Sequence, residues 1–275
     1  MYFLLGEDVG ASPTPRMMDA AFRALGLDAV YQSLSTGPAE LSTVLAELKE
    51  SGVSGLNVTM PHKTSVLKML ESLDETASSA RAVNTIKREG ASYRGYNTDV
   101  GGIVRPLTSR GLHRIRNAAV LGTGGAARAF VAAMNALGCR SITAMSRHPA
   151  TASDFLSGMS AAFPNMDLEV VSVEDQTSHG FDLFFNASPC GSDAVPVPPQ
   201  LSKILDGKPT VFDAVYSPVE TELIGRARAR GCQVIYGHEM LLHQGAEAVR
   251  IWTGSPPPLP PMKEALMASL EVPAR

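Results

Sequence analysis

The chain is organised around a glycine-rich segment whose residue types and spacing suit the binding of a dinucleotide. Residues 118–121 are apolar and predict a buried strand, and an alanine-rich segment of helical character runs to about residue 137. Between them, Gly122, Gly124 and Ala127 match the G-x-G-x-x-G/A spacing of a dinucleotide-binding turn. Gly122 allows a tight turn, Gly124 lets the backbone approach a pyrophosphate, and Ala127 lets the helix pack against the strand. The helix N-terminus would offer N–H groups and partial positive charge to the phosphates.

The next strand end indicates which dinucleotide is bound. An ordinary tight turn would also explain the glycines, but a second apolar run, at 142–145, follows at the spacing that a βαβ unit requires. It ends at Ser146 and Arg147, where an enzyme that prefers NAD usually has an acidic residue for the ribose 2′-hydroxyl. A hydroxyl and a guanidinium suit a 2′-phosphate, so we expect NADP rather than NAD, with a solvated surface arginine as the alternative for Arg147. The turn residues expected to bind it are Gly122, Thr123, Gly124, Gly125 and Ala126.

Lys63 and Asp99 are charged residues whose local positions suggest chemistry. Residues 55–59 alternate apolar and polar side chains and predict a strand, and Pro61 is expected to end it and start a helix. Lys63 would then lie in the first turn of that helix, against the helix dipole, and departures of this kind are expected at functional sites. Asp99 precedes a further helical segment. The structural alternatives are a surface charge for Lys63 and a helix cap for Asp99.

Two hydroxyl residues follow the first expected strand. Ser12 and Thr14 lie in a loop, a usual place for contacts to a ligand. Thr14 could instead serve only as the cap of a helix that begins at Pro15 and runs to about residue 25.

The elements that position these residues divide the chain near residue 100. The first part mixes strands and helices, whereas from residue 118 strands and helices alternate, which predicts a doubly wound parallel sheet of Rossmann type. The strands expected in the second part are 118–121, 142–145, 168–171, 181–185, 211–215 and 233–236. In the first part we expect strands at 1–5, 29–34, 55–59, 83–86 and 93–96, and helices at 15–25, 38–51 and 74–81.

Composition excludes several classes of protein. The chain has 275 residues, 44% hydrophobic and 19% charged, which is typical of a soluble globular protein. A net charge of −3 without a Lys/Arg run argues against nucleic acid, and no apolar stretch is long enough for a membrane span. The apolar residues at the start lack a basic segment, so a signal peptide is not expected. Cys139, Cys190 and Cys232 fit neither a disulfide framework nor a metal site, so we expect a cytoplasmic protein without a metal.

Several motifs in order along the chain together identify a family. They are Asn57-Val58-Thr59-Met60-Pro61-His62-Lys63, Ala82-Val83-Asn84-Thr85, Gly95-Tyr96-Asn97-Thr98-Asp99, the glycine turn, Asn186-Ala187-Ser188, Asp213-Ala214-Val215-Tyr216-Ser217-Pro218 and Gly237-His238-Glu239-Met240-Leu241-Leu242-His243-Gln244. Between Ser12 and Gly254 the chain resembles the shikimate dehydrogenase family, which includes quinate and shikimate dehydrogenases. The resemblance implies a substrate domain of residues 1–100 completed by C-terminal helices at about 238–275, and a dinucleotide-binding domain of residues 101–237.

The resemblance also implies an activity, the NADP-dependent interconversion of shikimate and 3-dehydroshikimate by hydride transfer. Lys63 and Asp99 match the catalytic pair: the lysine would stabilise charge on the reacting oxygen and give up a proton, and the aspartate would orient it. The positions that match substrate contacts are Ser12, Thr14, Asn57, Thr59, Asn84, Tyr216 and Gln244, besides the pair itself. Further positions that match the cofactor site are Asn186, Ala187, Ser188, Val215, Gly237 and Met240.

Departures from the family pattern leave the substrate open. Ala11 replaces the usual histidine, Thr14 replaces the second serine, and Met18-Asp19 replaces His-Asn. Quinate-using relatives can carry threonine at the position of Thr14, so quinate, aminoshikimate or another hydroxylated ring carboxylate is the alternative substrate. A regulatory protein that binds the cofactor without turnover is a further alternative, against which the retention of Lys63 and Asp99 argues. Monomer and homodimer both stay open.

Overall fold

The chain folds into two compact units, which are described separately. The computed structural model describes residues 1–174 and 180–271. Unit 1 comprises Met1–Gly102 and Leu241–Arg275, and unit 2 comprises Ile103–Met240. Helices α4 (Asp99–Thr108) and α9 (Gly237–Thr253) contain residues of both units. Among the helices of the described residues, none combines the length and apolar character that a membrane span needs.

Unit 1 is built on a mixed six-stranded sheet of order β2-β1-β3-β5-β6-β4. Strand β1 pairs in parallel with β2 and β3, and β5 is antiparallel to β3 and β6. The strands are β1 (Tyr2–Gly6), β2 (Tyr31–Ser35), β3 (Gly55–Val58), β4 (Ser72–Leu73), β5 (Thr85–Glu89) and β6 (Ser92–Tyr96). The helices are α1 (Thr14–Ala24), α2 (Leu41–Glu50), the 3₁₀ helix η1 (Ser65–Met69), α3 (Glu75–Ala80) and α10 (Leu259–Leu270).

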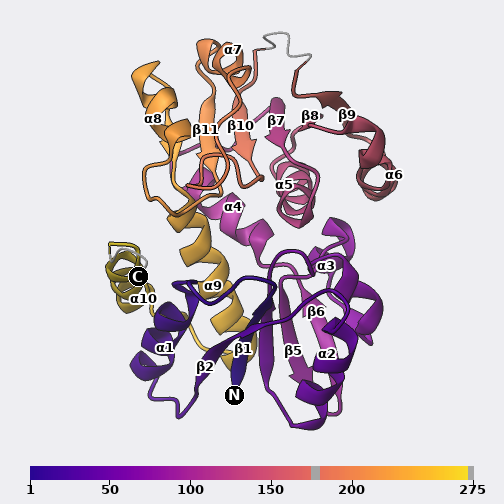
Figure 1. Ribbon diagram of the computed structural model, residues 1–275, viewed down its shortest axis with the longest axis vertical. Coiled ribbons are helices and arrows are strands. Elements are labelled where there is room, and N and C mark those ends of the chain that lie inside the picture. Colours follow the sequence, from indigo (N-terminus) through magenta and orange to yellow (C-terminus); the bar gives the residue numbers. More distant parts are fainter. Residues whose placement is uncertain (175–179, 272–275) are drawn as a thin grey trace. The chain divides into compact units, whose positions relative to one another are not determined.

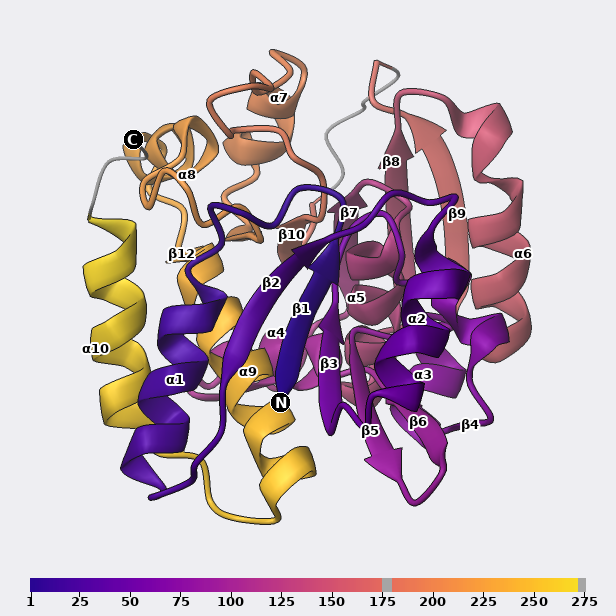
Figure 2. The same ribbon diagram turned by 60° about the horizontal axis from the view of Figure 1, so that its bottom comes forward.

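Each face of this sheet is covered by its own helices (Figure 2). Leu4 of β1 packs in a buried cluster with α1, α9 and α10, whereas the neighbouring Phe3 packs against the cluster formed by α2, η1 and α3. This alternation follows from the period of two in a strand. Trp252 of α9 belongs to the first cluster, and its Nε1 donates to the carbonyl of Ile86 at 2.9 Å. The C-terminal part of α9 is therefore held against the sheet of unit 1, whose strand β3 contains Asn57.

Unit 2 is a parallel doubly wound sheet, which confirms the fold predicted for this part of the chain. Its strands have the order β12-β11-β10-β7-β8-β9, and every pair is parallel (Figure 1). The strands are β7 (Asn117–Leu121), β8 (Ser141–Ser146), β9 (Asp167–Ser172), β10 (Leu183–Asn186), β11 (Thr210–Asp213) and β12 (Val234–Ile235). The helices are α5 (Gly125–Ala136), the 3₁₀ helix η2 (Pro149–Ala152), α6 (Ser153–Ala162), α7 (Leu201–Asp206) and α8 (Glu222–Ala229).

The strand order reverses between β7 and β10, and this reversal determines the ligand edge, by which we mean the edge of the sheet at the carboxyl ends of β7 and β10. In such sheets the crevice for a ligand lies beyond the carboxyl ends of the strands at the reversal point. Leu121 of β7 is in register with Asn186 of β10, so the glycine turn and the Asn186 loop leave the sheet side by side. Phe130 of α5 stacks on Phe185 at 4.8 Å on one face, while α7 and α8 cover the other face.

Two local expectations were wrong. Lys63 does not lie in the first turn of a helix: residues 61–64 form turns before η1, and the carbonyl of Lys63 accepts from the backbone N–H of Val83 at 2.7 Å. Thr14 is the first residue of α1 rather than its cap, because α1 starts one residue earlier than expected and Pro13 precedes it without a side-chain cap. At Lys63, a backbone hydrogen bond to Val83, 20 positions along the chain, thus takes part in fixing a conformation that local sequence did not predict.

Candidate active site

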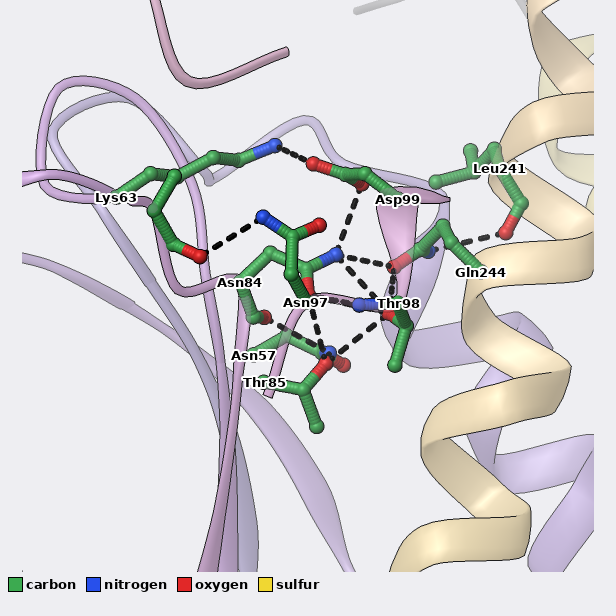
Figure 3. A network of polar contacts seen from close by, with 10 residues as sticks. Asn57, Lys63, Asn84, Thr85, Asn97, Thr98, Asp99, Leu241 and Gln244 are labelled. Carbon is green, nitrogen blue, oxygen red and sulfur yellow. Dashed lines mark hydrogen bonds and ion pairs between the residues drawn. The ribbon is translucent and has the colours of Figure 1, made fainter. Parts of the chain in front are cut away.

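Lys63 and Asp99 form an ion pair in unit 1. The Lys63 ammonium donates to Asp99 Oδ2 at 2.6 Å (Figure 3). The side chains of Lys63 and Asp99 are 17% and 4% exposed. Lys63 comes from the turn after β3, and Asp99 is the first residue of α4. The fold thus brings together a cation and a carboxylate that are 36 residues apart in the chain. Because the lysine keeps some exposure while the aspartate is buried, the amine is the member of the pair that a small molecule can reach.

Asn84 holds the other oxygen of the same carboxylate. Its Nδ2 lies 2.8 Å from Asp99 Oδ1, 3.0 Å from Thr98 Oγ1 and 3.4 Å from Gln244 Oε1. Its Oδ1 accepts from the backbone N–H of Thr98 at 2.7 Å, which fixes the orientation of the amide. The Asp99 carboxylate is therefore held between the Lys63 amine and the Asn84 amide, and it fixes the orientation of the lysine side chain.

Asn57 extends this network toward the centre of the sheet. Its Nδ2 donates to Thr85 Oγ1 at 3.0 Å and to the carbonyl of Asn84 at 3.2 Å, and its Oδ1 accepts from the Tyr31 hydroxyl at 2.8 Å. Burial raises the pKa of Tyr31, so the hydroxyl stays protonated and donates. Tyr31, Thr85 and Thr98 were not predicted as site residues. Thr85 and Thr98 lie inside the quoted motifs, where each follows an asparagine, but no sequence signal points to Tyr31.

Ser12 and Thr14 form a separate hydroxyl pair. Ser12 Oγ donates to Thr14 Oγ1 at 3.1 Å and accepts from the backbone N–H of Thr14 at 3.3 Å. Thr14 is 3% exposed, whereas Ser12 is half-buried. Thr59, also half-buried, follows β3 directly, and its N–H donates to the carbonyl of Leu5 at the end of β1. These hydroxyls thus belong to the loops that follow β1 and β3 in unit 1.

The glycine turn of unit 2 has the geometry that a dinucleotide requires. Gly122 has φ of +105°, which favours glycine, and its N–H donates to the carbonyl of Met145 in β8 at 2.9 Å. A Cβ at this position would lie 3.4 Å from the backbone of Ala187, so two loops meet here closely. Gly124 precedes α5, and a Cβ there would meet nothing within 4 Å. Among the described residues no side chain caps α5, so the N–H groups of its first turn have no side-chain partner and are suited to bind an anion.

The remaining predicted cofactor residues occupy neighbouring strand ends. Ser146 ends β8 and its Oγ accepts from the N–H of His148, while Arg147 is exposed just beyond the strand. Asn186 ends β10 and is fully buried, with its amide bonded to Cys190 and Asp213. Its side chain therefore shapes the loop, and Ala187 offers only backbone and a methyl group.

Val215, Tyr216, Gly237 and Met240 belong to unit 2 as well. A Cβ at Gly237 would overlap the carbonyl oxygen of Val215, which explains glycine at the start of α9. Met240 is 7% exposed, and Tyr216 is half-buried. Tyr216 is thus the one predicted substrate residue outside unit 1. Among residues 1–174 and 180–271, no group of His, Cys, Asp or Glu side chains could hold a metal ion.

Asp213 gives the stability of the protein a specific pH dependence. Burial raises the pKa of Asp213 to about 6, from 3.8, although hydrogen bonds from Thr221, Val215 and Asn186 lower it in part. Since the folded pKa is the higher one, the stability contributed by the protonated form is present below pH 4 and is lost as pH rises through 6. Relative to Asp213→Asn, the free energy of unfolding of the wild type should fall by about 2 kcal/mol between pH 4.5 and 7. Urea denaturation of both proteins at both pH values measures this. A wild-type free energy of unfolding that stays constant or rises with pH relative to the variant would contradict it.

The chain is similar to known proteins along nearly its whole length. The family model of the shikimate dehydrogenase substrate binding domain matches residues 4–86, and that of the shikimate 5′-dehydrogenase C-terminal domain matches residues 237–267. Shikimate dehydrogenase (NADP(+)) of Moorella thermoacetica is 38% identical over 283 residues, which cover 98% of this chain and 95% of that protein.

Solved structures agree with this likeness. Shikimate 5-dehydrogenase from Thermus thermophilus, in complex with NADP(H) and shikimate, is 30% identical with a TM-score of 0.83, covering 98% of this chain and 99% of that one. Quinate dehydrogenase from Corynebacterium glutamicum, in complex with NAD, is 28% identical with a TM-score of 0.86, covering 97% of this chain and 98% of that one.

Proposed function

Because this chain belongs to the shikimate dehydrogenase family, we propose that it interconverts shikimate and 3-dehydroshikimate with NADP. The observation that carries the proposal is the ion pair between Lys63 and Asp99, with Asn84 bonded to the same carboxylate. A buried network that ends in one partly exposed amine is suited to a reaction in which a proton moves to or from an oxygen atom.

Lys63 is the proposed acid and base of the reaction. As a ring carbonyl is reduced, negative charge develops on its oxygen, and a nearby ammonium stabilises that charge and donates the proton. In the oxidation, the same amine receives the proton from the ring hydroxyl. Asp99 keeps the amine oriented, since Asn84 prevents the carboxylate from turning away.

The other polar residues of unit 1 are proposed to hold the ring. Asn84 and Gln244 carry amides that both donate and accept, which suits a ring with several hydroxyl groups. Asn57 is proposed as a further ring contact, and its hydrogen bonds to Thr85 and to the carbonyl of Asn84 also support those two residues. Ser12 and Thr14 would bind the carboxylate of the substrate, with Thr59 and Tyr216 as further contacts.

The residues of unit 2 fit a phosphorylated dinucleotide. Bound NADP supplies or accepts the hydride. The turn from Gly122 to Ala126 and the first turn of α5 would hold the pyrophosphate, and Arg147 with Ser146 would hold the 2′-phosphate. The backbone of Ala187 and Val215, with Gly237 and Met240, would line the nicotinamide end.

Quinate is the second candidate substrate, and Thr14 is the observation that favours it. Its Cγ methyl is buried and adds bulk to a hydroxyl pair that in the family pattern consists of two serines. A changed carboxylate pocket could admit a ring with an additional hydroxyl group. The similarity to a quinate dehydrogenase over 97% of the chain agrees with this possibility.

Initial rates with shikimate and quinate, each against NADP and NAD, test the proposed function. We expect the highest kcat/KM for shikimate with NADP. The variant Thr14→Ser, measured in the same four combinations, should raise the shikimate-to-quinate ratio if Thr14 selects between them. The proposal would be excluded if neither shikimate nor quinate were turned over with either cofactor. A higher kcat/KM for quinate than for shikimate would identify quinate as the substrate.

We further propose that the protein is a cytoplasmic enzyme and that it is a monomer or a homodimer.

A further inference from the structure

Asp213 is a buried carboxylate at the ligand edge of unit 2 to which the proposed reaction gives no role. It is the last residue of β11 and has no exposed surface. Its Oδ2 accepts from the Thr221 hydroxyl at 2.6 Å. Its Oδ1 accepts from Asn186 Nδ2 at 2.8 Å and from the backbone N–H of Val215 at 3.0 Å. One carboxylate therefore joins the end of β10 to both ends of the loop that follows β11.

The bond to Asn186 leads to the glycine turn. Asn186 Nδ2 also donates to the carbonyl of Cys190 at 2.7 Å, and its Oδ1 accepts from the Ser188 hydroxyl at 2.7 Å. The loop after β10 is therefore folded around this amide. The backbone of Ala187 in that loop lies where a Cβ on Gly122 would touch it. A displacement of Asn186 is thus transmitted directly to the turn proposed to hold the pyrophosphate.

The other two bonds fix the loop after β11. The Val215 N–H is held by Asp213, and the carbonyl of Val215 is in close contact with Gly237 at the start of α9. Thr221 donates to Asp213 and also caps α8, since its Oγ1 accepts from the N–H of Ile224 at 3.2 Å. Both ends of the loop at 214–221 consequently depend on the same carboxylate.

We infer that Asp213 is a positioning residue for NADP: it fixes the loops at 187–190 and 214–221 against the glycine turn without touching the nucleotide. The inference rests on the proposed function for the identity of the cofactor. All three partners donate a hydrogen, which only the ionised carboxylate can accept in full. Burial raises the pKa of Asp213 only to about 6, so the ionised form predominates at neutral pH. An amide at this position would direct an NH₂ group at one of the three donors.

The substitution Asp213→Asn in the full chain tests the inference. We expect the Kd for NADPH, measured by fluorescence titration at pH 8, and the KM for NADP to rise about tenfold, because a buried donor loses its partner. The KM for shikimate should rise less than the KM for NADP, because Tyr216 is the one proposed substrate residue in the loop that Asp213 holds and the others belong to unit 1. The variants Thr221→Val and Thr221→Ser extend the test: valine should weaken NADPH binding, and serine, which keeps the hydroxyl, should restore it.

Asp182→Asn is the matched control. Asp182 precedes the same strand β10 at its opposite end, where its Oδ2 accepts from the backbone N–H groups of Arg116 and Asn117. It undergoes the same chemical change without a link to the glycine turn, so its Kd for NADPH should not change. An unchanged Kd in both Asp213→Asn and Thr221→Val, or an equal loss in Asp182→Asn, would overturn the inference. Because NADPH binding is read without turnover, failure of the proposed substrate would leave this readout intact.

Discussion

Lys63→Ala is expected to lower kcat by about 10³-fold, the range typical for loss of one positioned acid and base that also stabilises charge. The ion pair with Asp99 at 2.6 Å holds the Lys63 amine at the partly exposed end of the hydrogen-bond network. Lys63→Met, which keeps most of the aliphatic stem, should show the same loss. Steady-state rates at saturating shikimate and NADP measure the effect.

The control for this substitution is Lys68→Ala. Lys68 is exposed in η1, five positions further along the chain, and its removal should leave kcat unchanged. Because Asp99 is buried and would lose its counter-charge, thermal unfolding of the Lys63 variants needs to be compared with the wild type. NADPH binding should persist, since the proposed nucleotide residues belong to unit 2. A kcat within tenfold of the wild type in a folded variant would remove Lys63 from the catalytic role.

The fold of unit 2 could be predicted because its signals are local. Apolar runs of strand length recur at βαβ spacing, and this alternation is typical of a parallel sheet covered by helices on both faces. The ends of the strands were less certain. Residues 181–185 were expected to form a strand, whereas β10 covers Leu183–Asn186, because pairing with β7 and β11 sets its limits.

The candidate site could be predicted as a set of residues but not as a network. Lys63 was selected as a candidate because we expected it in the first turn of a helix, but it lies in a turn before η1. The residue was therefore proposed for a local reason that the structure contradicts. The contact between Asn84 and Gln244 joins residues 160 positions apart, a distance that spacing alone cannot bridge. Asn186 matches a cofactor position of the family, yet its amide is bonded to Cys190 and Asp213 of this chain. Motifs thus indicate which segments form the site. The packing of the folded chain decides which residues of a motif are free to contact a ligand and which only support their neighbours.

Arg147→Ala is expected to raise the KM for NADP by about 10²-fold and to leave the KM for NAD nearly unchanged. The side chain is exposed just after β8, and β8 is the parallel neighbour of the strand that leads into the glycine turn. The adenosine ribose of a dinucleotide held at that turn reaches the end of this neighbouring strand. A guanidinium there would form charge-assisted hydrogen bonds to a 2′-phosphate, each contributing about 1.5–3 kcal/mol, and NAD lacks that group.

Arg140→Ala is the matched control for this selectivity. Arg140 is also exposed and lies next to the other end of β8, so the change removes the same charge from the same strand. If long-range attraction of an anionic cofactor were responsible, both variants would weaken NADP alike, and the loss would shrink at high salt for both. A loss confined to Arg147→Ala would instead locate a direct contact. Equal weakening of NADP and NAD in Arg147→Ala would exclude recognition of the 2′-phosphate by this residue, because the common part of the two cofactors would then carry the effect.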